Sequence, residues 1–286
     1  MVEIYLLEQL AAFHRCGTLS AAAEELHITQ PSLSRSMQKL EDVLGVKLFD
    51  RSRNRITLNR TGEMAAGYAE GILQSEKVME QSIRNYDQSL HTVSLGFCAP
   101  GPQILILPGA SARFEGMAVS SRMERDDALL EGLHSHRYNC VFLSHPVEEE
   151  GMFCKEYLSE HLYLSVPQNH PAATRSSIAF SEMDGQSFLM YKQVGIWEAV
   201  VRKMMPKASF FPQEQLEALG ELEACSSLPS FVSGISRENL DVRKNGRVAV
   251  PFSDPEAEIT YYMVCREENK NRFLPLLRGD GNSFSA

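Results

Sequence analysis

The side chains with the clearest chemical potential lie in residues 18–39, TLSAAAEELHITQPSLSRSMQK. The second half of this stretch carries short hydroxyls, amides and two cations, with no carboxylate before Glu41. Arginine and glutamine can read base edges in a major groove, while serine and lysine can hold phosphates. The simpler alternative is the solvated face of an amphipathic helix. The residues predicted here to contact duplex DNA are Ser20, Thr29, Gln30, Pro31, Ser32, Ser34, Arg35, Gln38 and Lys39.

Two short helices joined by a tight turn would position these side chains. Thr18 and Ser20 are both suitable N-cap residues before an alanine-rich run, and Thr29 can cap a second helix with Pro31 in its first turn. Apolar residues at helical spacing form a stripe on the other side of this second helix. The stripe consists of Leu33, Met37, Leu40 and Leu44. The pattern predicts a helix-turn-helix.

A basic hairpin is predicted after the second helix. Gly45 can end that helix, and residues 46–49 and 56–58 have the composition of two short strands. The turn between them is rich in arginine, and a hairpin in this place is a wing that can follow the DNA backbone. The wing adds Arg51, Arg53 and Arg55 to the predicted DNA contacts.

The charge of the chain is divided unevenly. The whole sequence of 286 residues has a net charge of −9, but residues 27–60 carry +4 and residues 61–286 carry −10. A basic patch on an acidic body would orient the protein on DNA and keep the body away from it.

The segment SAAAEELHITQPSLSRSMQKLEDVLGVKLFDR, followed by RITLNRTGE, resembles the amino-terminal signature of the LysR-type transcriptional regulators. The resemblance implies an α-rich winged helix-turn-helix, a long linker helix and an α/β effector domain with two lobes, like a periplasmic binding protein. It covers the whole chain in architecture and about the first third in motif. We expect a DNA-binding domain at 1–60, a linker and dimerisation helix at 61–90 and an effector domain at 91–286. Lobe I would span about 91–164 and 263–278, and lobe II about 165–262.

The linker helix carries an apolar side. Ile72, Met79 and Tyr86 are spaced by sevens, which allows the stripe to lie against a partner over several turns. The alternative is packing on its own domain, but a helix that extends between two domains has little of its own chain to lie on. We therefore expect a homodimer or homotetramer, which would present two recognition helices to a pseudo-palindromic site. The predicted dimerisation residues are Met64, Tyr68, Ile72, Met79, Ile83 and Tyr86.

Strands and helices alternate in the rest of the chain, which favours a parallel sheet in an α/β domain. Ligands of such sheets bind beyond the carboxyl ends of the strands. Four loops fit this description, and by resemblance they line the cleft for a small-molecule effector. The predicted effector-binding residues are Pro100, Gly101, Pro102, Gln103, Ser144, Tyr191, Lys192, Gly195, Trp197, Pro229 and Ser230.

The chemistry of these loops predicts an anionic effector. Gly101 and Gly195 would allow close backbone approach, and two helix N-termini beside them would favour a negative group. With Lys192 adding charge, we expect a small carboxylate whose apolar portion rests on Trp197. The opposite interpretation, that Trp197 packs between the lobes and Lys192 is solvated, is equally open. The chain departs from the family at residues 223–229, where relatives have a glycine-rich turn, so the floor of the pocket should differ.

The sequence lacks the motifs that are typical of enzymes and of metal sites. It contains no GxSxG, HExxH, P-loop or dinucleotide fingerprint, so we expect no enzyme activity, no catalytic residue and no cofactor. No cysteine pair or histidine has zinc-site spacing, and no metal site is expected. Peroxide-sensing relatives use a cysteine pair in the effector domain, and no matching motif is present. A regulator switched by cysteine redox chemistry or by protein partners is nevertheless the alternative function.

The expected location is the cytoplasm. No apolar run approaches the roughly 18 residues needed to span a bilayer. The first ten residues, MVEIYLLEQL, include two glutamates and no basic leader, unlike a signal peptide. We therefore expect no membrane partner.

Overall fold

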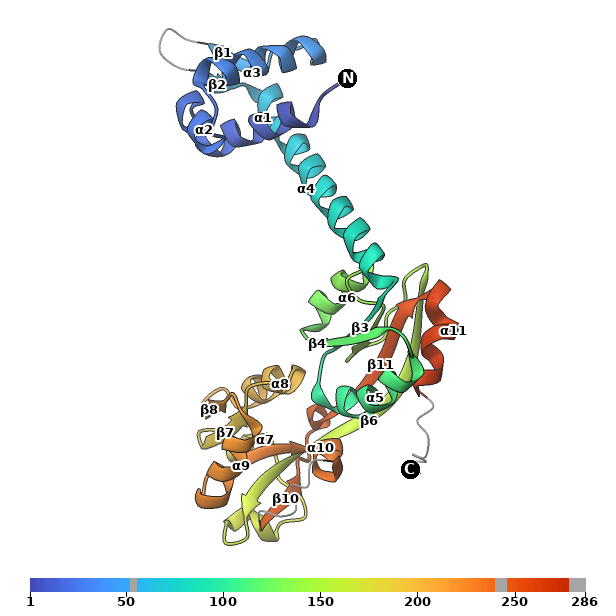
Figure 1. Cartoon of the computed structure of the whole chain (residues 1–286). Coiled ribbons are helices and arrows are strands. Elements are labelled where there is room, and N and C mark those ends of the chain that lie inside the picture. Colours follow the sequence, from blue (N-terminus) through green and yellow to red (C-terminus); the bar gives the residue numbers. More distant parts are fainter. Residues whose placement is uncertain (52–55, 240–245, 278–286) are drawn as a thin grey trace. The chain divides into compact units, whose positions relative to one another are not determined.

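The computed structural model describes residues 1–51, 56–239 and 246–277. The chain forms two compact units, unit 1 (Met1–Arg84) and unit 2 (Asn85–Ala286), and the division falls inside helix α4 (Arg60–Ser89). Each unit has its own hydrophobic core. The helices and strands of both units are drawn in Figure 1.

Unit 1 contains the predicted winged helix-turn-helix. Helices α1 (Ile4–Cys16), α2 (Leu19–Glu25) and α3 (Gln30–Leu44) precede an antiparallel pair of strands, β1 (Phe49–Arg51) and β2 (Ile56–Leu58). Thr18 caps α2, and the Thr29 hydroxyl accepts a hydrogen bond from the backbone N–H of Ser32 to cap α3. Gly45 ends α3 with a left-handed φ of 70°. The helices, Thr caps and glycine stop are confirmed, while the strand expected at 46–49 begins only at Phe49.

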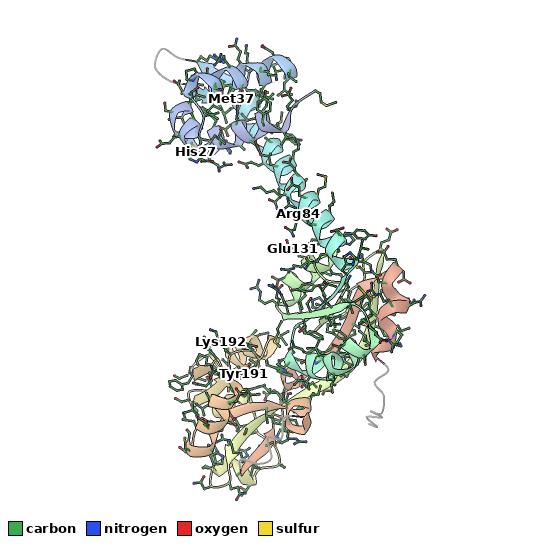
Figure 2. The ribbon with its side chains drawn as sticks, viewed as in Figure 1. His27, Met37, Arg84, Glu131, Tyr191 and Lys192 are labelled. Atoms are coloured by element: carbon green, nitrogen blue, oxygen red, sulfur yellow. The ribbon has the colours of Figure 1, made fainter. Side chains whose placement is uncertain are left out.

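The core of unit 1 uses most of the predicted apolar stripe. Leu33, Met37 (labelled in Figure 2) and Leu40 are buried against residues of α1 and α2. Leu44 is 42% exposed, because it lies in the last turn of α3, next to the end of the helix. The expectation that it joins this core is therefore wrong.

The main sheet of unit 2 is mixed. Strand β3 (Thr92–Phe97) is parallel to β4 (Ala118–Met123) and β5 (Cys140–Leu143), as the alternation of elements predicted. Strand β11 (Glu258–Arg266) returns from far along the chain and pairs antiparallel with β5 and with β6 (Met152–Pro167). The parallel sheet is therefore confirmed for β3, β4 and β5, whereas the antiparallel pairing of β11 was not expected, because its partners in β5 lie more than a hundred residues away in the sequence.

A single long strand serves both lobes of unit 2. The first part of β6 pairs with β11, and its last part pairs antiparallel with β9 (Ser230–Ser233) and β10 (Arg247–Pro251) (Figure 1). Strands β7 (Ser187–Tyr191) and β8 (Ser209–Gln213) form a separate parallel pair.

The remaining elements of unit 2 are helical. They are α5 (Pro100–Arg113), α6 (Asp126–His134), α7 (Phe180–Met183), α8 (Ile196–Met204), α9 (Leu216–Cys225), α10 (Gly234–Asn239) and α11 (Lys270–Phe273). Short 3-10 turns cover Pro171–Thr174, Pro255–Ala257, Glu267–Asn269 and Leu274–Leu277. The last residues of the chain, 278–286, lie outside the described residues. No helix in the described ranges has the length and apolar character that a membrane crossing requires.

Candidate functional site

The polar face of α3 is exposed to solvent in unit 1. Arg35, Gln38 and Lys39 are exposed, as are Pro31 and Gln30, while Ser32 and Ser34 are half-buried. Thr29 and Ser20 are exposed at the starts of α3 and α2. The two helices therefore bring the predicted DNA contacts onto accessible surface, which is the placement that readout of a major groove requires.

Arg35 and Lys39 differ in what they already bind. The Nε of Arg35 donates to the carbonyl oxygen of Pro31 at 3.3 Å, one turn earlier on the same helix. The Nζ of Lys39 lies 3.1 Å from a carboxylate oxygen of Glu3 and 3.0 Å from the hydroxyl of Tyr5, and these two hydrogen bonds raise the pKa of Lys39. Lys39 was predicted to contact DNA, but Glu3, the N-cap residue of α1, already supplies it with an acidic partner.

Glu41 faces inward and joins α3 to the wing. Its side chain is almost fully buried, and one carboxylate oxygen accepts the N–H groups of Leu48 at 2.8 Å and Phe49 at 3.3 Å. Lys47 at 3.2 Å and Arg51 at 3.4 Å approach the other oxygen. Burial raises the pKa of Glu41, but the hydrogen bonds from Leu48, Lys47 and Phe49 outweigh it and leave the pKa below its usual value.

Among the described residues of the wing, Arg51 forms an ion pair with Glu41 of the same domain. Arg51 remains 44% exposed beside Glu41. The other two predicted wing contacts, Arg53 and Arg55, lie outside the described residues.

The apolar side of α4 is uncovered in the single chain. The predicted dimerisation residues are all exposed, from 46% for Ile72 to 70% for Tyr68. The ring of Tyr86 also meets the ring of His136 edge-on, with centroids 5.6 Å apart. In unit 1 the stripe borders an apolar groove of about 320 Å³, whose lining includes Leu7, Leu44, Met64, Tyr68 and Ile72.

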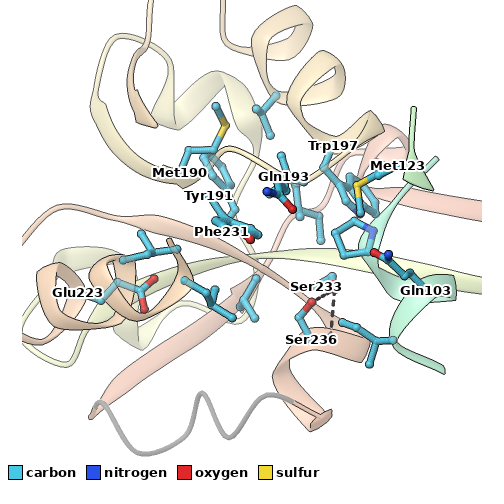
Figure 3. Close-up of a pocket in the computed structure, with 18 residues that line it drawn as sticks. Gln103, Met123, Met190, Tyr191, Gln193, Trp197, Glu223, Phe231, Ser233 and Ser236 are labelled. Atoms are coloured by element: carbon cyan, nitrogen blue, oxygen red, sulfur yellow. Dashed lines mark hydrogen bonds between the residues drawn. The ribbon is translucent and has the colours of Figure 1, made fainter. Parts of the chain in front are cut away.

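A pocket of about 270 Å³ lies between elements of the two lobes of unit 2, and we call it the interlobe pocket (Figure 3). Most of its lining is apolar, and Glu223 is its only charged residue. The lining comprises Pro100, Gln103, Ile104, Met123, Leu162, Met190, Tyr191, Gln193, Val194, Trp197, Val201, Leu216, Leu219, Glu223, Phe231, Val232, Ser233 and Ser236.

A larger open cavity of about 1,220 Å³, the interlobe groove, shares Met123 and Gln193 with this pocket. Carboxylates dominate its charge. Its two cations are already paired: Arg125 with Asp127 at 2.7 Å and Lys192 with Glu214 at 2.6 Å. The other acidic residues of its lining are Glu124, Asp126 and Glu198.

The structure brings some of the predicted effector residues together and separates others. Pro100, Gln103, Tyr191 and Trp197 line the interlobe pocket, whereas Lys192 and Gly195 line the interlobe groove. Tyr191 and Lys192 are neighbours (Figure 2), yet they line different cavities. The predicted residues that line neither are Gly101, Pro102, Ser144, Pro229 and Ser230. Ser144 binds Asp126, and the Ser230 hydroxyl donates to the carboxylate of Glu223.

Gly101 and Gly195 allow other parts of the same chain to approach their backbone closely. A Cβ on Gly101 would lie 2.5 Å from a carboxylate oxygen of Glu160, and one on Gly195 would lie 2.1 Å from the carbonyl oxygen of Cys98. Gly195 also has a left-handed φ of 60°, which favours glycine. Their predicted role, close approach to a ligand, is therefore taken by the protein's own groups.

Glu160 is a buried charged residue beside the interlobe pocket that the sequence pattern did not indicate. It is 3% exposed on β6, and its Oε2 accepts the hydroxyl of Tyr261 at 2.8 Å and the indole Nε1–H of Trp197 at 3.4 Å. Burial raises the pKa of Glu160, against the opposing effect of its hydrogen bonds from Ser233, Tyr261 and Trp197. Its carboxylate lies against Gly101, in the first turn of α5. The carboxylate of Glu160 therefore lies at the helix N-terminus where an anionic group of the effector was expected.

Trp197 is packed in the core, as one of the two interpretations left open by the sequence expected, and its predicted contact with an effector stays a prediction. It is buried, with 4% exposure, and it also lines the interlobe pocket. Lys192 is an exposed residue paired with Glu214, which raises the pKa of Lys192.

Arg247 organises the segment that departs from the family pattern. Its guanidinium donates to the carbonyl oxygens of Glu223 at 3.0 Å, Leu228 at 2.6 Å and Ser165 at 2.9 Å. These bonds connect the end of α9, the turn that follows it and β6 through one charged side chain. No signal in the local sequence points to this role.

The cysteines of the core are poorly suited to reaction. Burial raises the pKa of the Cys98, Cys140 and Cys265 thiols, and the thiolate is the reactive form. Cys140 and Cys265 are partners across β5 and β11, and both are buried. Within the described ranges, no group of three or more His, Cys, Asp or Glu side chains is arranged to hold a metal ion.

Known proteins share both parts of this architecture. Residues 4–63 match the family described as "Bacterial regulatory helix-turn-helix protein, lysR family", and residues 98–274 match the "LysR substrate binding domain". An uncharacterized HTH-type transcriptional regulator of Bacillus subtilis is 29% identical, over 94% of this chain and 92% of that protein. A hydrogen peroxide-inducible genes activator of Haemophilus influenzae is 25% identical, over 93% and 92% respectively.

Solved structures show the same fold. A full-length OxyR variant from Pseudomonas aeruginosa has a TM-score of 0.52 at 21% identity, covering 97% of this chain and 93% of that chain. Full-length BenM has a TM-score of 0.50 at 20% identity, covering 96% and 94%. Because both family matches fall on the domains described above, this chain belongs to the LysR-type family of DNA-binding transcriptional regulators, which are not enzymes.

Proposed function

We propose that this regulator binds operator DNA as a homodimer or homotetramer in the cytoplasm, and that a small molecule in the interlobe pocket changes this binding. The observation that carries the proposal is the pocket itself, which is bounded by elements of both lobes and includes the buried Trp197. A ligand that contacts two lobes can favour one arrangement of them over another.

The DNA contact is proposed for α3 and the wing. Arg35 offers an exposed guanidinium at the centre of the helix face, with Gln38 one turn further on. Arginine recognises guanine and glutamine recognises adenine through paired hydrogen bonds. Ser32 and Ser34 would hold the backbone beside them, together with the predicted wing arginines.

The oligomer is proposed to form through α4. Its six exposed apolar side chains extend over more than twenty residues, and the apolar groove of unit 1 continues the surface. A second copy of α4 would cover this surface and remove apolar area from water, at roughly 25 cal/mol per Å² before the cost of association.

The class of effector follows from the lining of the interlobe pocket. Its only charged lining residue is the carboxylate Glu223, and its walls include Met190, Trp197 and Phe231. The carboxylate of Glu160 already lies against the start of α5. We therefore infer a mainly apolar effector that is uncharged or cationic, in place of the carboxylate that the sequence suggested.

A matched set of probes tests this inference. Tryptamine, tryptophol and indole-3-acetate share one ring and differ in charge, so each can be titrated while the melting temperature of the full-length protein is followed. Tryptamine or tryptophol should raise the melting temperature by mass action, and indole-3-acetate should not. The Gln193→Trp variant should lose the shift because it fills the pocket, while Gln168→Trp, outside the lining, should keep it. Stabilisation by indole-3-acetate alone would contradict the proposed class.

The redox alternative rests on the relatives named as hydrogen peroxide-inducible activators. In this chain the only cysteines described as facing one another on adjacent strands, Cys140 and Cys265, are buried and have raised pKa values. Their thiols are therefore poor nucleophiles for peroxide. A Cys140–Cys265 disulfide formed by stoichiometric peroxide, with a change in operator affinity, would establish this alternative.

A further inference from the structure

A second pocket of about 300 Å³ in the first lobe of unit 2 shares no lining residue with the interlobe pocket, and we call it the polar pocket. Residues 85–89 of α4, the edge strand β4 and residues 136–138 after α6 contribute to it. All of its lining residues are polar. They include four serines and two arginines, and no carboxylate.

Two buried polar atoms in this lining lack hydrogen-bond partners. Tyr138 is 2% exposed, and its hydroxyl has no partner within bonding distance. The Nδ1 atom of His136 is likewise buried and unpartnered, and His136 adopts a left-handed φ of 59°. Unsatisfied buried polar groups cost free energy, and strained backbone is often found where ligands bind. A ligand that accepts a hydrogen bond from Tyr138 would remove one of these costs.

The charge of the polar pocket is positive. Arg122 is exposed on β4 and forms no ion pair within the described ranges of the chain. Arg137 is partly neutralised, because its Nη2 lies 2.7 Å from a carboxylate oxygen of Glu124. Burial raises the pKa of Tyr138, and so does the Glu124 carboxylate near its hydroxyl, so the hydroxyl stays protonated and can donate. Arginine and hydroxyl donors together are the groups that bind phosphate in proteins.

The polar pocket is too small to be a binding surface for nucleic acid. A volume of about 300 Å³ is at the lower end of small-molecule sites, which suits a phosphate group and the small molecule that carries it. The hydroxyls of Ser94 and Ser120 lie 3.0 Å apart and form one hydrogen bond, which leaves one of the two O–H groups to donate to a ligand.

We propose that the polar pocket binds a small dianionic oxyanion, either free phosphate or the phosphate group of a small metabolite. The anion would accept hydrogen bonds from Arg122, from the hydroxyl of Tyr138 and from the serines of β4. Asn85 and Ser89 belong to the end of α4, so the ligand would connect this helix to the edge of the sheet. The two pockets share no lining residue, but a 3.1 Å hydrogen bond from Gln103 of the interlobe pocket to Ser121 of the polar pocket joins their linings.

Titration calorimetry of the full-length protein tests the proposal, with inorganic phosphate and ribose 5-phosphate at constant ionic strength. We expect saturable binding of one anion per chain. Arg122→Gln should weaken it at least tenfold, because it removes the unpaired cation. Arg113→Gln is the matched control, since Arg113 is exposed in the same lobe and lies outside the lining, and it should change the affinity less than twofold.

Tyr138→Phe separates a binding role from a structural one. The variant removes an unpartnered buried hydroxyl, so its melting temperature without phosphate should equal or exceed that of the wild type, while phosphate should bind several-fold more weakly. Saturable binding of either anion with this pattern supports the site. The proposal is overturned if neither anion binds saturably, if Arg122→Gln and Arg113→Gln lose affinity equally, or if Tyr138→Phe melts lower and binds phosphate normally.

Discussion

The hydroxyl of Tyr261 on β11 donates a 2.8 Å hydrogen bond to the buried carboxylate of Glu160 on β6. Trp197 on α8 approaches the same oxygen, so elements from both lobes meet at one titratable group. Burial is the main influence on this carboxyl, and it raises the pKa of Glu160 from its usual value. The native state of unit 2 therefore holds this proton more tightly than the unfolded chain.

The first prediction concerns the pH dependence of unit 2. Because the pKa of Glu160 is raised on folding, its contribution to stability is fully present below the unfolded pKa, about 4.5, and is lost as pH rises through the folded pKa. Glu160→Gln should remove this component. Urea unfolding can be followed through Trp197, the only tryptophan, at pH 5 and pH 7.5. Identical pH dependences for the variant and the wild type would show that Glu160 is not responsible.

The second prediction has the opposite sign and concerns unit 1. The pKa of Glu41 is lowered on folding, so its contribution is present above about pH 4.5 and is lost as pH falls through the folded pKa. Glu41→Gln should destabilise unit 1 at pH 7 by about 1–3 kcal/mol, because it weakens the hydrogen bonds to Leu48 and Phe49. Hydrogen exchange of the α3 amides measures the loss. An unchanged exchange rate at pH 7, or an equal loss at pH 3.5, would contradict the assignment.

The third prediction concerns the Glu3–Lys39 pair. Glu3→Gln should free Lys39 to contact phosphate, which should raise affinity for DNA several-fold and steepen its salt dependence. Glu8→Gln removes the same charge from the exposed side of α1 without touching Lys39 and serves as the control. Fluorescence anisotropy with a labelled duplex measures both. If the two variants gain equally, the effect is one of net charge alone.

The fourth prediction concerns assembly through α4. Ile83→Asp would place a charge in the proposed seam between two copies, at a cost of several kcal/mol. Sedimentation velocity should show a smaller species, and operator affinity should fall with it. Gln74→Asp, an exposed position off the stripe, should leave the assembly unchanged. An unaltered oligomer for Ile83→Asp would mean that the stripe is covered in another way.

The local signals of the sequence predicted the local structure well. Thr29 and Gly45 act through their own turns, so the ends of α3 could be recognised from residue type alone. Glu41, Glu160 and Arg247 could not be recognised, because their partners are contributed by other elements of the fold. For the same reason, Gly101 and Gly195 were identified as special positions, but what they approach in the structure is another part of the chain.

The most direct test of the central claim is selection of bound sequences from a random duplex library by the full-length protein and by Arg35→Ala. We expect the wild type to enrich an inverted repeat, with half-sites about one helical turn or a multiple of it apart, because two copies present two α3 helices. Arg35→Ala should relax base preference at one position of each half-site, at a cost of about 1–3 kcal/mol. No enriched repeat for the wild type, or an identical motif for the folded variant, would contradict it.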